Sequence, residues 1–205
     1  RRPRPDDFQI KEAAEKIKKS KNPIIISGGG VFYSNAMEEL SNFAIKHNIP
    51  VTQTVMGYST MKRDHSHYAG QIGGLGGKNT NDLAKETDLA IAVGTKLADF
   101  TTGSWANFEN ENFKLLSINV SRFDANKHLA QAVVGDAKVS LIELSEALGD
   151  WKVGDEWNEK SQRELKVWNE HIDKESAPTN QEVPSYIQVI GAIYRNSEPT
   201  DIAVT

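Results

Sequence analysis

The stretch 24–30 reads Ile24-Ile25-Ile26-Ser27-Gly28-Gly29-Gly30, an apolar run that stops at three glycines before a helical pattern begins near Ser34. Residues without side chains, where a strand meets a helix, would let a phosphate-bearing ligand approach the backbone and the helix N-terminus. The run lacks the full G-x-G-x-x-G spacing of dinucleotide-binding proteins. A tight turn that needs positive φ angles is therefore an equally good explanation of the three glycines.

Strand and helix patterns alternate on both sides of this stretch. Expected helices cover residues 8–19, about 34–44 (with Ser34 or Asn35 as the cap), 79–85 and 138–148, and expected strands cover residues 24–27, 49–54, 88–94, 115–120 and 132–134. Repeated βα units with short connections predict an α/β fold, a Rossmann-like parallel sheet of five or six strands with helices on both faces. In such an order the first strand, 24–27, lies at the centre.

Two connections are candidates for function. The polar, glycine-rich stretch 57–78 is longer than an ordinary βα connection. It contains His65 and His67, but a lone histidine pair in a loop is weak evidence for a metal and is more simply solvated. The stretch 94–105 carries hydroxyl and small residues that could offer donors to an anion. The alternative is a connection whose hydroxyls bond to their own backbone.

Several of these polar or glycine positions fall at the ends of predicted strands. Gly28 to Gly30, Gly94-Thr95 and Asn119 each fall at the C-terminal end of a predicted strand. In open parallel sheets, ligands dock beyond the carboxyl ends of the strands. The sequence therefore predicts a ligand crevice at this edge of the sheet.

Composition limits the classes of function. The chain has 205 residues, 38% of them hydrophobic, and a formal net charge of -4, which argues against general nucleic-acid binding. The cluster Arg1-Arg2-Pro3-Arg4 is expected to be a solvated linker.

There are no cysteines, which excludes a disulfide framework and a thiolate zinc site and fits a cytoplasmic protein. No apolar run is long enough to span a membrane. Neither H-E-x-x-H nor G-x-S-x-G occurs, so no catalytic residue and no metal ligand is predicted.

The βα rhythm ends near Trp151. We expect residues 1–150 to form the Rossmann-like domain, residues 151–183 a helical linker and residues 184–205 the start of a truncated second domain, with a new strand from Asp201. The chain is accordingly expected to be a fragment of a larger protein.

The order of motifs resembles a known superfamily. After the strand and its three glycines come I-P-V-T-x-T at 49–54, D-L-A-I-A-V-G-T-K-L-x-D at 88–99, I-N-V at 118–120 and V-G-D-A-K at 134–138. Residues 8–148 resemble the central domain of thiamine-diphosphate-dependent enzymes of the acetolactate synthase type. The run D-F-T-T-G-S at 99–104 is most similar to the members that hydrolyse trihydroxycyclohexane-1,2-dione in myo-inositol breakdown. An acetolactate synthase-like carboligase is the runner-up, and a non-catalytic nucleotide-binding or oligomerisation module is the alternative from another class.

The resemblance implies a three-domain parent that works as a homo-oligomer, a dimer or tetramer, on a small-molecule substrate. Thiamine diphosphate and Mg²⁺ are implied to sit between the N-terminal and C-terminal domains of neighbouring subunits. The activating glutamate and the G-D-G motif of the family are implied to lie outside this chain, and Gly135-Asp136-Ala137 is no substitute. The chain alone is therefore expected to be inactive and to bind neither group.

Some relatives hold FAD or ADP in the central domain, and the resemblance carries that crevice onto positions of this chain. They are Gly28, Gly29, Gly30, Gly94, Thr95, Asn119, Gly135 and Asp136. Asn119 and Ser121 stand where flavin-binding relatives often carry acidic residues. A structural crevice is therefore expected in preference to an occupied one.

Overall fold

A computed structural model describes residues 2–198 and 200–201 of the chain. It forms two compact units, Arg1–Leu165 and Lys166–Thr205. Within the described residues, no helix combines the length and apolar character that crossing a membrane requires. The strand expected from Asp201 lies largely outside the described residues.

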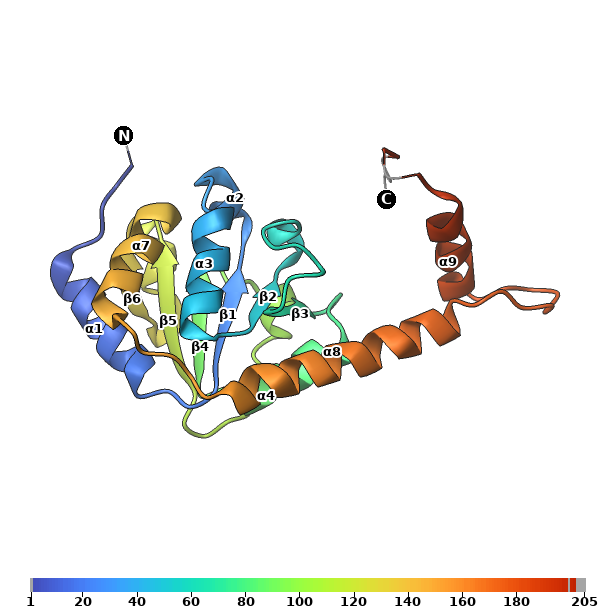
Figure 1. The fold of residues 1–205 in the computed structure, drawn as a ribbon. Coiled ribbons are helices and arrows are strands. Elements are labelled where there is room, and N and C mark those ends of the chain that lie inside the picture. The colour runs from blue at the N-terminus through green and yellow to red at the C-terminus, as the bar shows by residue number, and fades with distance from the viewer. Residues whose placement is uncertain (1, 199, 202–205) are drawn as a thin grey trace. The chain divides into compact units, whose positions relative to one another are not determined.

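A single parallel sheet organises the first unit (Figure 1). Its strands are β1 (Pro23–Ser27), β2 (Val51–Gln53), β3 (Tyr68–Gln71), β4 (Leu89–Val93), β5 (Lys114–Asn119) and β6 (Gln131–Val134). Their order is β3-β2-β1-β4-β5-β6, and every neighbouring pair is parallel. Ile25 of β1 pairs with Val51 on one side and with Ile91 on the other. The predicted Rossmann-like sheet of five or six strands, with the first strand at its centre, is confirmed.

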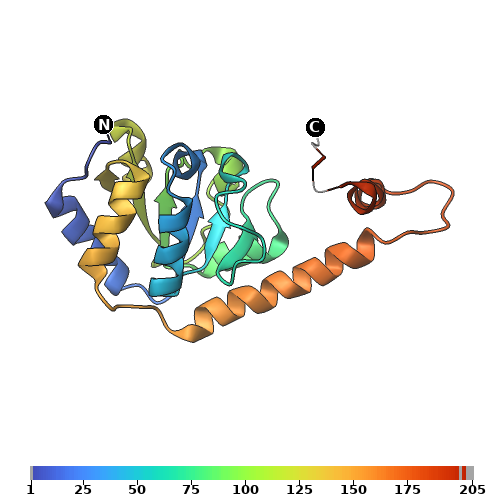
Figure 2. The same ribbon diagram turned by 45° about the horizontal axis from the view of Figure 1, so that its top comes forward.

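Side chains that alternate along β1 build a core on each face of the sheet. Ile25 joins the apolar faces of α1 (Asp7–Lys18), α3 (Met37–His47) and α7 (Ala137–Leu148). Figure 2 shows these three helices side by side over one face. Ile24 and Ile26 point to the other face, where α4 (Lys78–Glu86) and Trp157 pack. β1 and β4 are buried along their whole length because both faces are covered.

The structure corrects three local predictions. β3 lies inside the stretch 57–78 that was expected to be a loop; its sequence Tyr-Ala-Gly-Gln is short, and its pairing with β2 carries an irregularity. β2 is shorter than the expected strand 49–54. The helix expected at about 34–44 is α3, which begins at Met37 after Ala36 and has no side-chain capping bond, so neither Ser34 nor Asn35 is its cap. A short helix that was not predicted, α2 (Gly29–Tyr33), precedes it.

The basic residues Arg2 and Arg4 are exposed to solvent as expected, but their segment is docked on the domain and is not a free linker. Pro5 is buried, and the Arg2 guanidinium lies 2.8 Å from a carboxylate oxygen of Asp136. Arg4 Nε donates to Glu143 Oε1 at 2.6 Å. Two carboxylates at the start and middle of α7 therefore hold these arginines.

The remaining short elements are η1 (Val55–Gly57), α5 (Asp99–Thr102), α6 (Arg122–Ala125) and η2 (Lys127–Leu129). α8 (Asp155–Glu175) begins in the first unit, where Trp157 is buried and its Nε1 donates to Pro23 O at 2.8 Å. α9 (Tyr186–Asn196) belongs to the second unit and begins with a capping box between Ser185 and Gln188.

Candidate functional site

The carboxyl ends of β1, β4, β5 and β6 meet at one edge of the sheet and carry the candidate residues there. Backbone hydrogen bonds link them across the strands. Gly28 N donates to Val93 O at 2.9 Å, Gly94 N to Ile118 O at 2.9 Å, and Gly135 N to Asn119 O at 3.1 Å. The parallel sheet thus brings together all four candidate segments, which are far apart in the sequence.

The glycines at this edge pack against one another. A Cβ atom on Gly28 would lie 2.5 Å from Gly94 O, and one on Gly30 would lie 2.6 Å from Gly94 Cα. Gly28 has a φ of -116°, so positive φ angles do not explain the glycine at this position. The first βα turn needs small residues because the β4 end approaches it closely. The backbone of Gly94 therefore fills the space that a side chain on Gly28 or Gly30 would need.

The polar side chains at this edge bond to the edge itself. Asn119 Nδ2 donates to Thr95 O at 3.1 Å, and Asn119 Oδ1 accepts from Ser121 N at 3.0 Å. Thr95 Oγ1 accepts from Leu97 N at 3.3 Å. Thr102 Oγ1 likewise accepts from Trp105 N at 3.2 Å. For the stretch 94–105, the structure therefore favours a connection whose hydroxyl groups bond to their own backbone.

Asp136 has a structural role in this arrangement. Its Oδ1 accepts from the backbone N–H groups of Lys138 at 3.1 Å and Val139 at 3.4 Å, which caps α7. Its backbone N–H donates to Pro3 O at 2.9 Å. A Cβ atom on Gly135 would lie 2.8 Å from Pro5 Cδ. The N-terminal segment therefore covers Gly135 and engages Asp136.

Exposed apolar side chains surround the glycines and were not predicted as site residues. Phe32 and Tyr33 project from α2, Met56 from η1 and Phe123 from α6. A Cβ atom on Gly29 would lie 3.0 Å from Met56 O and 3.7 Å from the Tyr33 ring. The signal in the sequence is Val31-Phe32-Tyr33, three apolar residues directly after the glycines. This edge thus presents apolar surface beside the place where the backbones of Gly28, Gly30 and Gly94 pack together.

These features agree with one family of proteins. Residues 10–144 match the family described as "Thiamine pyrophosphate enzyme, central domain". The chain belongs to this family.

Three curated relatives share one description, 3D-(3,5/4)-trihydroxycyclohexane-1,2-dione hydrolase. The protein of that name from Bacillus cereus (strain AH820) is 43% identical over 144 residues, which are 70% of this chain and 22% of the relative. The one from Clostridium perfringens (strain 13 / Type A) is 39% identical over 166 residues, 81% of this chain and 26% of the relative. The one from Clostridium tetani (strain Massachusetts / E88) is 38% identical over 170 residues, 83% of this chain and 26% of the relative. The chain thus spans about a quarter of the length of these relatives.

The thiamine pyrophosphate of the family does not fit the residues of this central domain. In the described part of the chain, no three His, Cys, Asp or Glu residues gather as a metal site would require. The one carboxylate among the candidate residues, Asp136, caps a helix and pairs with Arg2.

The two loop histidines are structural in this central domain. His65 Nδ1 accepts from His67 N at 3.1 Å, and His65 Nε2 lies 2.8 Å from Ser41 Oγ. His67 Nε2 lies 3.0 Å from Asn48 Oδ1. Burial, and then the neighbouring His65, lower the pKa of His67 to about 4. Both rings are engaged by the protein, which supports neither a metal nor the solvated state expected from the sequence.

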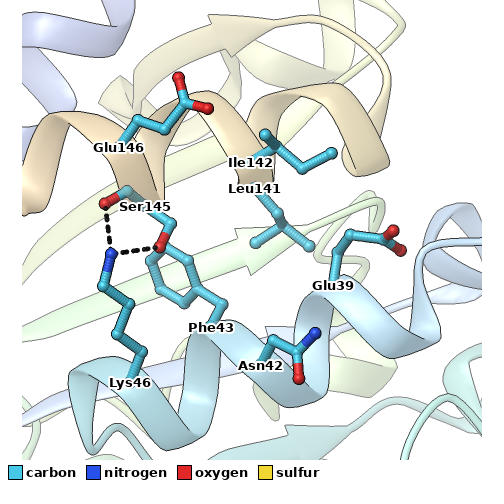
Figure 3. Close-up of a pocket in the computed structure, with 8 residues that line it drawn as sticks. All are labelled: Glu39, Asn42, Phe43, Lys46, Leu141, Ile142, Ser145 and Glu146. Carbon is cyan, nitrogen blue, oxygen red and sulfur yellow. Dashed lines mark hydrogen bonds between the residues drawn. The ribbon is translucent and has the colours of Figure 1, made fainter.

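A pocket of about 230 Å³ lies between α3 and α7, away from the glycine edge (Figure 3). Phe43 and Leu141 form its apolar part, and Lys46 Nζ donates to Ser145 O at 3.3 Å at one end. The Ser145 hydroxyl in its lining lies 3.0 Å from His47 Nε2, and His47 Nδ1 lies 2.7 Å from Trp151 O. Three further pockets of the described chain also lie away from the eight candidate residues.

Proposed function

We propose that this chain is the central domain of a thiamine-diphosphate-dependent hydrolase that opens the ring of trihydroxycyclohexane-1,2-dione to a deoxy-uronic acid. The observation that carries the proposal is the shared name of relatives that are 38% to 43% identical over this domain. The run 99–104, which forms α5 and its C-terminal turn, is the segment most typical of those hydrolases in the sequence.

The role of this domain in the parent is architectural. Thiamine diphosphate, with Mg²⁺, supplies the electron sink for C–C bond cleavage when the parent protein binds it. The sheet, its two apolar cores and the docked N-terminal segment form a rigid body that can hold neighbouring domains at fixed positions. We propose a cytoplasmic homo-oligomer in which residues 151–183 are a linker and residues 184–205 begin the C-terminal domain.

Assays of the full-length parent test the activity. We expect turnover of the dione with thiamine diphosphate and Mg²⁺, and no conversion of pyruvate to acetolactate. Turnover of pyruvate alone would favour the acetolactate synthase-like carboligase. A gene that encodes no further domain would favour the non-catalytic module.

Calorimetry on the 205-residue chain tests whether this domain by itself binds thiamine diphosphate or Mg²⁺. Because the chain offers no metal-ligand cluster among its described residues, we expect no binding of thiamine diphosphate or Mg²⁺ with a Kd below about 100 μM. Tighter binding of either would contradict the assignment of this chain as a purely supporting domain.

We further propose that the glycine edge is a structural junction that holds neither FAD nor ADP. The close approach of Gly28 and Gly30 to Gly94, and the engagement of Asn119 by Thr95, support this. Titration of the chain with ADP and with FAD should give Kd values above about 100 μM. Stoichiometric, tighter binding of either nucleotide would reinstate Gly28, Gly29, Gly30, Gly94, Thr95, Asn119, Gly135 and Asp136 as its site.

A further inference from the structure

The pocket between α3 and α7 has in its lining a serine hydroxyl that contacts a buried histidine. Ser145 Oγ of α7 lies 3.0 Å from Nε2 of His47, the last residue of α3. His47 is fully buried, whereas Ser145 is half-buried. On the far side of the imidazole ring, Nδ1 lies 2.7 Å from Trp151 O. A hydroxyl, an imidazole and an acceptor that orients the imidazole form the arrangement that activates a serine nucleophile.

Hydrogen-bond chemistry fixes the position of the proton on this histidine. A carbonyl oxygen only accepts, so His47 Nδ1 carries the proton and donates it to Trp151 O. Burial lowers the pKa of His47 while the bond to Trp151 opposes the shift, so the ring is neutral at pH 7.5. Nε2 of the neutral ring is then an acceptor, and the Ser145 hydroxyl donates to it. His47 is therefore able to take the proton of Ser145, as a general base must.

Two other serine–histidine pairs lack this combination. Ser41 Oγ lies 2.8 Å from His65 Nε2, but His65 Nδ1 accepts from the backbone N–H of His67. The proton of a neutral His65 is therefore on Nε2, which donates to Ser41 and cannot act as its base. Ser66 Oγ lies 3.0 Å from His67 Nδ1, but a pKa of about 4 makes that ring a weak base. Neither serine belongs to the lining of the four pockets described above.

We propose that Ser145 is an acylation site at which the domain hydrolyses small carboxylic esters, an activity separate from the thiamine-diphosphate chemistry proposed for the parent. Ser145 Oγ attacks the carbonyl carbon of the ester while its proton passes to His47 Nε2. The C–O bond to the alcohol breaks, and the alcohol leaves with that proton. Water then attacks the acyl group in the same way, which releases the acid and restores the Ser145 hydroxyl. Lys46 Nζ, 3.4 Å from Ser145 Oγ, is the cation that can balance the oxyanion of the tetrahedral intermediate (Figure 3).

The lining of the pocket sets the class of ester. Its volume of about 230 Å³ suits a short acyl chain, and Phe43, Leu141 and Ile142 provide apolar surface for that chain. Glu146 also lines the pocket, and its carboxylate disfavours a negatively charged substrate. An uncharged ester with a short acyl chain is therefore the expected substrate.

Reaction of the 205-residue chain with an alkyl fluorophosphonate tests the nucleophile, because an activated serine displaces fluoride and forms an Oγ–P bond. Mass mapping of peptides should place the adduct on Ser145 and leave Ser41 and Ser66 unmodified. The imidazole ¹⁵N chemical shifts of His47 at pH 7.5 should report a proton on Nδ1 and none on Nε2. Absence of an adduct on Ser145, or a proton on His47 Nε2, would overturn the proposal.

Variants test turnover with p-nitrophenyl butyrate. Ser145→Ala should lower the rate of hydrolysis at least about tenfold, since the nucleophile and its base act together. Ser41→Ala is the matched control, because it also removes a half-buried hydroxyl that contacts a histidine ring, and it should keep the rate of the wild type. Circular dichroism verifies that both variants fold, and the adduct on the wild type decides if one does not. Equal rates in Ser145→Ala and the wild type, or an equal loss in both variants, would refute the site.

Discussion

At the scale of single residues, the glycine edge shows that a glycine can be required by a neighbour rather than by its own backbone angles. Gly30 N donates to Gly94 O at 2.9 Å, and no Cβ atom fits between the two residues. The βα turn of β1 and the end of β4 are therefore mutually dependent. We therefore expect a side chain at Gly30 to lower the stability of the domain.

Gly30→Ala should lower the free energy of unfolding by about 1–3 kcal/mol, because the added methyl group overlaps the Gly94 backbone. Urea unfolding followed by circular dichroism measures the change. Gly154→Ala is the control, since a Cβ atom there meets nothing within 4 Å. Equal stability of the two variants would show that the junction relaxes freely and has room for a ligand.

His67 predicts how stability depends on pH. Its pKa is about 4 in the folded protein, against an ordinary value of 6.5, so the unfolded chain binds more protons between these values. The contribution of His67 to the free energy of unfolding is therefore fully present above about pH 6.5. It is lost as the pH drops towards 4, and the loss amounts to about 3 kcal/mol. Burial lowers the pKa of His47 and His65 in the same direction.

His67→Gln can retain a donor to Asn48 but cannot be protonated. Urea unfolding at several pH values between 7 and 4 should give a shallower loss of stability for this variant than for the wild type. An unchanged pH dependence would mean that the His67 ring is protonated without cost in the folded chain.

At the scale of elements, the start of α7 joins three parts of the fold. Asp136 caps the helix, is separated from β6 by Gly135 alone and holds Arg2 of the N-terminal segment. The N-terminal segment is thereby tied to the last βα unit of the sheet. The sequence motif V-G-D-A-K at 134–138 is thus explained by capping and docking.

Asp136→Ala should destabilise the chain by about 1–2 kcal/mol, mainly because the N–H groups of Lys138 and Val139 lose their acceptor. Asp136→Asn should retain most of that stability, since an asparagine also caps helices. Arg2→Ala should cost less than about 1 kcal/mol because its guanidinium is partly solvated. A larger effect for Arg2 than for Asp136 in chemical unfolding would contradict the capping role.

At the scale of the whole molecule, stability should come from the first unit. In α9 only Gly191 is buried, while Tyr186 and Tyr194 are 95% and 77% exposed. A chain ending at Glu182 should melt within a few degrees of the full chain, a change of under about 1 kcal/mol. Calorimetry or circular dichroism checks this value.

A chain ending at Gly154 is the informative comparison. It loses Trp157 and Leu165, both buried in the first unit, and the hydrogen bond from Trp157 to Pro23. We expect its melting temperature to fall by about ten degrees or more, as for the loss of a large core side chain. A drop of that size already in the chain ending at Glu182 would show that the tail stabilises the domain, against the proposed domain assignment.

The sequence by itself determined the parallel sheet, the central place of β1 and the convergence of its polar strand ends on one edge. These follow from local periodicity and from the fixed geometry of βα units, so apolar runs such as 24–27 and 89–93 suffice to predict them. Only the tertiary structure decided that Gly28 and Gly30 face Gly94 and that Arg2 docks on Asp136. Each of these joins residues far apart in the chain, and their contact depends on packing distances that periodicity along the chain does not encode.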